Sequence, residues 1–430
     1  MSPDLRADLW QLPGATRFLE ALQSDVRNRR SLVAVVPRWV SPQEVDVALR
    51  ERLDRDGFWV GDVPIAALVA DENPAIAIAR ELGIEWAAGA PHTLTGLVVA
   101  GDLPPVVELT GVSDVSPSEQ RGWLQFAAEW ARASKDAADD GDEPGTLCLI
   151  VRADAVAGGL PAVDTHLGVH CLWGFPDALE APLICRLALD GASSELQQRW
   201  REQVLPALAG DDVALMEQLW DPVLGPLEKV VASLLEYAAS RAWTAPSLRA
   251  LGLDAAWHEP RPGKHGLPAQ PPERLLPVWA AGALSASVER GMELHPAALA
   301  VLERDEEVRH RLWRGQVRLM LPVIDALRLR ACQEITDEMG DEWPLAYTTP
   351  NSRAEIDEVR DNPLNCQLGH LEHLLHRTEL SRWRPRWMGV IRCARAARNK
   401  LAHCQPVEFS DFQELMTEAQ RIGALTAFSL

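Results

Sequence analysis

Two kinds of apolar pattern divide the chain. In the first half, short runs rich in Val, Leu and Ile alternate with helix-like segments, and such runs are typical of buried strands. We expect strands at SLVAVVP (31–37), LTGLVVAG (94–101), PVVELTG (105–111), TLCLIVRA (146–153) and PLICRLAL (182–189). Strands that alternate with helices predict an α/β domain with a mostly parallel sheet, covering residues 1–195.

The clearest helix start in this half is SPSEQRGWLQFAAEWARA, which begins at Ser116. Ser116 is suited to the N-cap, Pro117 to the first turn, and Glu119 completes a capping box. The acidic stretch SKDAADDGDEPG (134–145) then predicts a solvated loop before the next strand.

The rest of the chain has a helical pattern. Residues 196–277 are predicted to be a helical extension that ends in the linker HEPRPGKHGLPAQPPERLLP (258–277), because proline lacks a donor and disfavours helix before it. Residues 278–430 are predicted to be an all-helical bundle. Its long helices are expected at 306–335, 368–377, 386–403 and 410–428, the last with Ser410 as its N-cap.

Charge and cysteine usage narrow the function classes. The formal net charge is −20, whereas a protein that coats duplex nucleic acid without specificity should be basic. Seven scattered cysteines form no C-x-x-C pair, which favours a reducing compartment. With no signal peptide and no apolar run of about 18 residues in view, we expect a cytoplasmic protein without a membrane partner.

The α/β half lacks a phosphate-binding loop. The chain after the first strand reads PRWVSPQEV (37–45), which has neither the glycines nor the lysine that cradle nucleotide phosphates. The layout of this half nevertheless resembles a degenerate P-loop ATPase core. It has an early strand, a later apolar strand ending at Asp154, and a helical region after that strand. We therefore expect no functional P-loop and assign no cofactor. The alternative that this half is a nucleotide sensor stays open, and a shift in melting temperature on adding a nucleotide would reveal it.

Two histidine groups are weak metal candidates. DTHLGVH (164–170) favours a loop or strand, in which His166 and His170 lie far apart. His370, His373 and His376 are spaced by three, so on a helix they drift round the axis and cannot converge on one ion. We assign no metal.

One motif near the end carries chemistry. RAARNKLAH (395–403) contains Arg398, Asn399 and His403, and it resembles the Arg-polar-x-x-x-His signature of HEPN domains, the helical bundles of many prokaryotic RNases and defence toxins. The downstream CQPVEFSDF and the upstream LPVIDALR and EWP segments are also similar to that family. The resemblance covers about residues 300–430.

This resemblance implies a metal-independent endoribonuclease, a toxin or antiphage-defence effector, that leaves 2′,3′-cyclic phosphate ends. It also implies a homodimer in which two motif helices face each other. The residue chemistry agrees: histidine transfers protons near neutral pH, and arginine grips phosphate with parallel donors. Asn399 and His403 are i, i+4 and share a helix face, so the amide can orient the imidazole or contact phosphate.

A basic strip surrounds the motif. Residues 377–400 hold eight basic side chains and one acid, a charge of +7 in a chain totalling −20, so the remaining residues carry −27. Cations interleaved with tryptophans suit single-stranded RNA or tRNA, because cations track phosphates and aromatic rings stack on bases. The predicted RNA contacts are Arg386, Trp387, Arg392, Arg395 and Lys400.

Two alternatives remain open. Basic residues at a helix C-terminus also complement the helix dipole, so the motif would be ordinary helical structure. A HEPN-like bundle can also be a non-catalytic scaffold or an RNA-binding subunit, working with partner proteins of a larger bacterial defence assembly.

Overall fold

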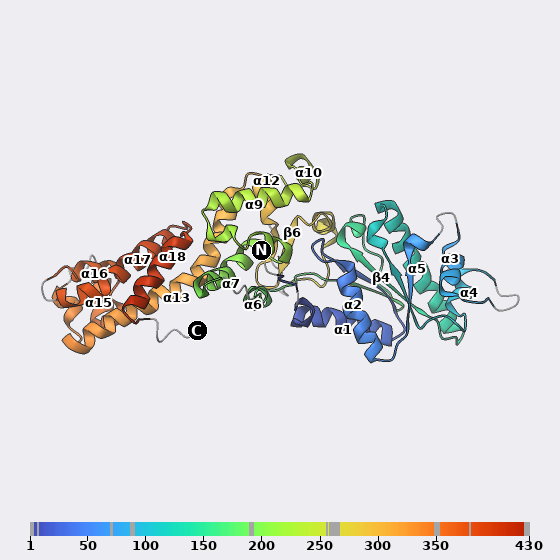
Figure 1. Cartoon of the computed structure of the whole chain (residues 1–430), viewed down its shortest axis with the longest axis horizontal. Helices are drawn as coiled ribbons and strands as arrows, with labels where there is room; N and C mark the ends of the chain where they lie inside the picture. The colour runs from blue at the N-terminus through green and yellow to red at the C-terminus, as the bar shows by residue number, and fades with distance from the viewer. Residues whose placement is uncertain are drawn as a thin grey trace.

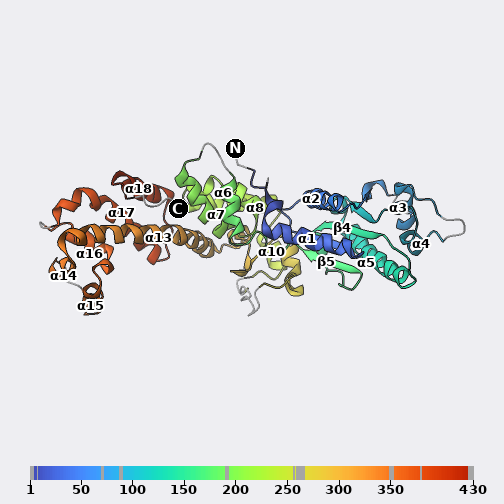
Figure 2. The same ribbon diagram turned by 90° about the horizontal axis from the view of Figure 1, so that it is seen from below.

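A computed structural model describes residues 4–6, 8–68, 72–86, 91–188, 193–254, 257, 267–347, 353–377 and 380–424. The molecule is elongated (Figure 1), with an α/β region at one end, a helical bundle at the other, and a mostly helical middle region between them. The same order is visible from a perpendicular direction in Figure 2.

The first region is built on a parallel sheet. Its described strands are β1 (Ser31–Val36), β2 (Val60–Pro64), β3 (Val106–Thr110), β4 (Thr146–Arg152) and β5 (Leu167–Cys171). They lie in the order β2-β3-β4-β1-β5, and each neighbouring pair is parallel. The predicted α/β class with a largely parallel sheet is therefore confirmed. The strands at 31–37, 105–111 and 146–153 are where the sequence placed them.

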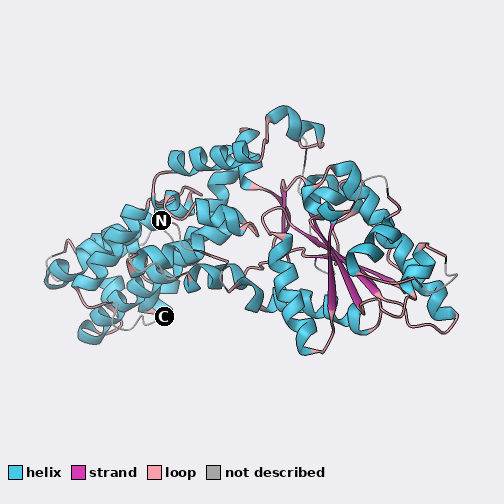
Figure 3. Ribbon diagram, turned by 45° about the vertical axis from the view of Figure 1, so that its right-hand side comes forward, coloured by secondary structure: helices cyan, strands magenta, loops and turns pink. Residues whose placement is uncertain are grey.

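Helices cover both faces of this sheet, which is why β1 is buried along its whole length. The chain runs from β1 out to the edge strand β2 and then returns through β3 to β4, and each connection between parallel strands is a crossover long enough to hold helices. The helices around the sheet are α1 (Pro13–Arg27), α2 (Pro42–Arg55), α3 (Pro74–Leu82), α4 (Leu94–Val98) and α5 (Pro117–Asp139). The helix that follows β5, α6 (Glu180–Leu187), packs instead against the next helix, Glu195–Ala209. Figure 3 shows the strands gathered at this end with helices around them.

Two predicted strands are helices. Residues 94–101 contain α4, whose first turn is capped by the Thr93 side chain. Residues 182–187 belong to α6, and residue 189 lies outside the described residues. Short apolar runs do not distinguish strand from helix by periodicity alone. In α6 the buried residues Ala181, Ile184 and Cys185 alternate with exposed Leu183 in the helical manner.

The helix start at Ser116 is confirmed, with both halves of the capping box formed by Ser116 and Glu119. The solvated loop predicted from residue 134 is wrong at its start, because α5 continues to Asp139. Ser134 and Ala137 face the core and hold this last part in helical form.

Where the structure describes it, the middle region is helical apart from one hairpin. Its elements are α7 (Glu195–Ala209), α8 (Val213–Gln218), α9 (Leu227–Ser240), α10 (Ala245–Ala250), α11 (Leu276–Ala280), β6 (Leu284–Ser287), β7 (Gly291–Leu294) and α12 (Pro296–Val301). The antiparallel pair β6–β7 was not predicted, since four-residue strands carry little pattern. Of the predicted linker, residues 258–266 lie outside the described residues.

The last region is helical from Asp305 onward, as the pattern predicted. The all-helical stretch expected from residue 278 was wrong at its start, because β6 and β7 lie within it. The helices of the last region are α13 (Asp305–Met339), α14 (Trp343–Tyr347), α15 (Arg353–Asp361), α16 (Leu368–Leu374), α17 (Arg384–Ala402) and α18 (Phe409–Arg421). The N-cap of α18 is Glu408, which forms a capping box with Asp411, so the assignment of Ser410 to the cap was wrong. The end of the predicted last helix, residues 425–428, lies outside the described residues.

Short 3-10 helices occur in all three regions: η1 (Leu9–Gln11), η2 (Ile65–Ala67), η3 (Val112–Asp114), η4 (Ala153–Val156), η5 (Pro222–Leu224), η6 (Glu273–Leu275), η7 (Pro363–Asn365) and η8 (Ser381–Trp383). The long helix α13 packs against α7 in the middle region and against α17 in the bundle, so it joins the two (Figure 1). Within the described residues, no helix has the length and apolar character needed to cross a membrane.

Candidate functional site

The motif lies on α17, a helix held by an apolar face. Buried side chains recur along it at Trp387, Ile391, Ala394, Ala397 and Leu401, the spacing of one helix face. That face packs against α13, α16 and α18. The opposite face is left to the charged and polar residues of the motif.

Arg398 and Asn399 are exposed and line a groove of about 730 Å³. Asp325 and Arg328 of α13 form one wall, and the segment that leads into α16 forms another, including His370. The structure therefore brings together on one surface residues that lie far apart in the chain. A concave site with a few convergent polar groups is the usual form of a ligand site.

His403 is the C-cap of α17 and is exposed. Its backbone N–H donates to the carbonyls of Asn399 (3.2 Å) and Lys400 (3.1 Å), which fixes the backbone at the helix end. It follows Asn399 by one helical turn, about 6 Å along the axis. The imidazole is not part of the groove wall, so the structure does not bring His403 into the groove with Arg398 and Asn399.

The chain after His403 is tied down by α13. The buried Gln316 side chain donates to the Val407 carbonyl and accepts from the Val407 N–H, both at 2.8 Å. The Trp313 indole N–H donates to the Leu401 carbonyl at 2.7 Å. These bonds satisfy backbone groups at the end of α17 and hold the motif against α13.

All four predicted RNA-binding cations are already paired. Arg386 forms an ion pair with Glu334 at 3.1 Å, and Lys400 forms one with Asp411 at 2.7 Å. The Glu372 carboxylate forms ion pairs with two further arginines. Those are Arg392 at 3.3 Å and Arg395 at 2.6 Å, and together they lower the pKa of Glu372, with the bond from Arg395 as the largest cause. Exposed pairs of this kind contribute little to stability and can exchange a carboxylate for a phosphate.

Arg398 differs from these cations. Among the described residues it makes no ion pair or side-chain hydrogen bond. An exposed guanidinium without an acidic partner is available for an anionic ligand, because it need not break an existing bond first.

The expectation that Trp387 stacks on bases is not supported. Its side chain is fully buried and its indole N–H donates to the Glu334 carboxylate at 2.9 Å. Trp387 is therefore part of the core of the bundle. The nearby Trp383 is also buried and is covered by the Arg382 guanidinium, 3.9 Å from its ring centre. The basic strip thus lacks the accessible aromatic rings that the sequence pattern indicated.

His370 is the groove residue that sequence reasoning missed. Spacing by three grouped it with His373 and His376, which are both exposed and outside the groove wall, whereas His370 is half-buried and lines the groove. Its position between buried Leu368 and Leu371 was a readable signal of a partly packed side chain. Among the described residues, no group of three His, Cys, Asp or Glu could hold a metal ion.

The histidines of the α/β region have structural roles. DTHLGVH enters β5, in agreement with the loop-or-strand interpretation. His170 Nε2 lies 2.6 Å from Asp25 Oδ2, and Asp164 accepts backbone N–H bonds from His166 and Leu167, both at 2.7 Å. The contact of His170 with Asp25 anchors β5 against α1, and the bonds to Asp164 order the turn before β5.

The carboxyl ends of β1 and β4 lie side by side, where the connections to the two sheet edges diverge. Ligands of open parallel sheets usually bind at such a point. Here Arg38 and Trp39 line a cavity of about 20 Å³, enough for about one water molecule. Arg38 donates to the Ala281 carbonyl at 3.2 Å. The segment after β1, where a phosphate-binding loop would lie, therefore contacts the middle region instead.

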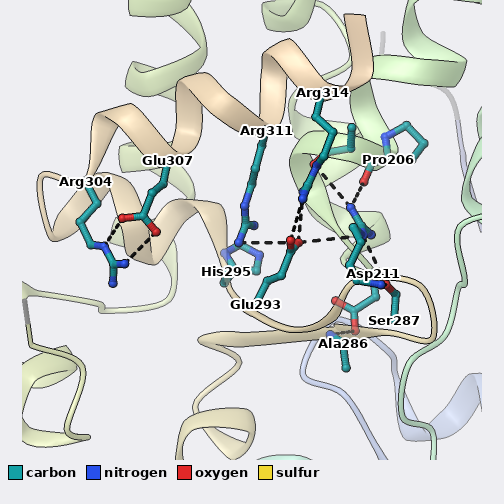
Figure 4. A network of polar contacts seen from close by, with 12 residues as sticks. Pro206, Asp211, Ala286, Ser287, Glu293, His295, Arg304, Glu307, Arg311 and Arg314 are labelled. Atoms are coloured by element: carbon teal, nitrogen blue, oxygen red, sulfur yellow. Dashed lines mark hydrogen bonds and ion pairs between the residues drawn. The ribbon is translucent and has the colours of Figure 1, made fainter. Parts of the chain in front are cut away.

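A buried charge cluster joins the hairpin to α13 (Figure 4). Arg314 donates to Glu293 through Nη1 (2.9 Å) and Nη2 (3.3 Å), while Arg311 Nη2 and Arg290 Nε lie 3.8 and 3.9 Å from the same carboxylate. Burial alone would raise the pKa of Glu293, but Arg311, Arg314 and Arg290 together lower it. The carboxylate is therefore ionised and compensates the buried arginines.

A second buried group lies next to this cluster. Burial lowers the pKa of His295, and its Nδ1 accepts the Ala297 N–H at 3.2 Å, so the neutral ring carries its proton on Nε2. That proton points to Asp212, 3.3 Å away, which also accepts the Tyr237 hydroxyl at 2.5 Å. Although burial opposes it, bonds from His295 and Tyr237 lower the pKa of Asp212. Each partner is satisfied, which indicates a structural role.

Comparison of the sequence with protein-family models and with curated proteins finds no match. The functional conclusion therefore depends on the geometry of the groove and on the motif.

Proposed function

We propose that this chain is a metal-independent endoribonuclease of the HEPN type, a toxin or antiphage-defence effector acting on single-stranded RNA or tRNA in the cytoplasm. The observation that carries the proposal is the position of Arg398 and Asn399 on the wall of a large groove, with His403 one turn beyond them. Arg398 binds the scissile phosphate, Asn399 orients the reacting groups, and His403 transfers a proton.

The proposed reaction needs no metal. The ribose 2′-oxygen attacks phosphorus as a base removes its proton, the bond from phosphorus to the 5′-oxygen breaks, and an acid protonates that oxygen. The products are a 2′,3′-cyclic phosphate and a 5′-hydroxyl, so atoms and protons balance. One positioned acid or base is worth about 10²–10⁴-fold in rate.

The proposed enzyme is a homodimer through the bundle and is regulated by its N-terminal part. Leu321, 38% exposed at the groove, offers apolar surface to a second copy. Helix α13 supports the regulatory link, because the same helix packs on α7 in the middle region and forms a groove wall in the bundle. A change in the front of the molecule that moves α13 would move Asp325 and Arg328 as well.

A non-catalytic HEPN-like scaffold or RNA-binding subunit is the second candidate. It is favoured by the ion pairs that occupy Arg386, Arg392, Arg395 and Lys400 and by the burial of Trp387. This function would place the chain in a larger defence assembly with partner proteins.

The deciding experiment is cleavage of a mixed pool of tRNA and single-stranded RNA in EDTA. Wild type is compared with Arg398→Ala, His403→Ala and the control Arg377→Ala, which removes an exposed cation of the same strip outside the groove wall. Cleavage by wild type and the control, with cyclic phosphate ends, supports the enzyme. If wild type is folded but inactive, and its expression is harmless to cells, the scaffold is the better account.

A further inference from the structure

We propose that His370 is the second proton-transfer group of this site and that the groove of a single chain holds the scissile phosphate between His370 and the motif. The inference rests on the proposed RNase function. It differs from the arrangement that the HEPN resemblance implies, in which two facing motif helices of a dimer supply the reacting groups.

The first observation is the orientation of α16. Leu368, Leu371 and Leu374 are buried and hold the helix on the bundle core. His370 lies between them, half-buried, on the groove wall that also includes Asn399. A half-buried imidazole inside a concave polar site can face a ligand while its position is restricted by packing.

The second observation is that α16 is fastened to α17. The Glu372 carboxylate is bonded to Arg395 at 2.6 Å and to Arg392 at 3.3 Å. One turn earlier, the Gly369 backbone lies against the same arginine, because a Cβ at this position would be 3.8 Å from Arg395 Nε. The distance from His370 to the motif is therefore set by direct contacts between the two helices.

The third observation concerns the opposite wall. Arg328 of α13 is paired with Asp325 at 2.8 Å and donates to the Cys366 carbonyl at 3.1 Å and to the Leu364 carbonyl. Cys366 lies in the turn that leads into α16, so α13 holds this turn in place. His370 is thus positioned from both sides, which a catalytic side chain requires.

The charges that face His370 favour an anion. The groove wall carries the cations Arg328, Arg395 and Arg398 and the single carboxylate Asp325, and Glu372 on α16 is occupied by its two arginines. A phosphate drawn to Arg398 would lie on the wall shared with His370. His403, one turn beyond Asn399 on α17, is the partner group in this proposal: one imidazole removes the proton from the 2′-oxygen and the other donates a proton to the 5′-oxygen.

The test compares His370→Gln with the matched control His373→Gln, which changes an exposed histidine of the same helix outside the groove wall. Cleavage is measured across pH in EDTA, and binding is measured with a 2′-O-methyl RNA that cannot be cleaved. Glutamine keeps the size and hydrogen-bonding capacity of histidine but cannot transfer a proton. Melting temperatures check that each variant is folded.

The expected result is a loss of about 10²–10⁴-fold in cleavage by His370→Gln, with one limb of the pH profile missing and 2′-O-methyl RNA binding retained. Wild-type-like cleavage by His370→Gln, equal to that of His373→Gln, overturns the inference and leaves the proposed RNase intact. Loss of binding together with cleavage, with an unchanged pH profile, also overturns it. If wild type cleaves no RNA, the proposed function and this inference both fail.

Discussion

Gly315 is the position where the structure makes the sharpest stability prediction. It lies inside α13 where α7 crosses, and a Cβ added there would be 2.7 Å from the Gln203 carbonyl oxygen, 2.8 Å from Val204 Cα and 3.0 Å from Ala207 Cβ. Alanine gains about 1 kcal/mol over glycine in a helix interior. Overpacking of a tight contact costs about 1–3 kcal/mol, and here two of the three neighbours are backbone atoms, so the helices must separate. We expect Gly315→Ala to be destabilising overall.

The assay is thermal unfolding followed by circular dichroism, in which about 1 kcal/mol corresponds to about 2–4 °C for a domain of about 150–250 residues. The matched control is Gly122→Ala in α5, an exposed helical glycine with no atom within 4 Å of the added Cβ. The control should stabilise by about 0.5–1 kcal/mol. If Gly315→Ala is as stable as wild type or more so, the close approach of α7 and α13 is not as described.

Three further predictions concern charge and capping. Glu293→Gln removes the carboxylate that compensates Arg314 and its neighbours and should cost about 3–5 kcal/mol of unfolding free energy at neutral pH. Because the folded pKa of Glu293 is lowered, the stabilisation by this carboxylate should be lost as urea titrations are repeated at falling pH. A destabilisation by Glu293→Gln that does not change with pH would contradict this reasoning. Burial and the neighbouring Asp46 raise the pKa of Glu108, although Arg50, 2.9 Å away, opposes the shift. Folding should therefore weaken as the pH rises above about 4.5, the ordinary pKa of this carboxyl, and Glu108→Gln should flatten that slope while changing melting little at low pH. Ser116→Ala removes the capping box of α5 and should cost about 1 kcal/mol in the same titration, whereas an unchanged midpoint would show that the cap is redundant.

Local signals were enough for the elements that carry a strong pattern. The apolar runs of β1, β3 and β4 identified the core of the sheet, and the Ser116–Glu119 box identified the start of α5, because these features depend on neighbours in the chain. The RAARNKLAH segment was placed at the end of a helix over 386–403, and α17 carries it there, with Arg398 and Asn399 exposed.

Short or two-sided segments were not predictable in the same way. The run at 94–101 and the run at 182–189 are as apolar as strands, and only packing against α5 and α7 decides that they are helices. The tryptophans of the basic strip illustrate the same limit. Trp387 stands among basic residues in the sequence, which indicated a surface position. In the bundle its side chain is buried, and its indole N–H donates to Glu334.

The sequence by itself determined the α/β front region, the largely helical character of the rest and the position of the Arg398–His403 motif at the end of a helix, whereas the chemistry of that motif stays a prediction. These follow from composition, periodicity and spacing, which are properties of neighbouring residues. Only the tertiary structure decided that Arg38 and Trp39 occupy the carboxyl ends of β1 and β4. It alone also decided that most cations of the strip are paired and that His370 shares a groove with Arg398. Each of these depends on contacts between segments far apart in the chain, and no local pattern records which segments will meet.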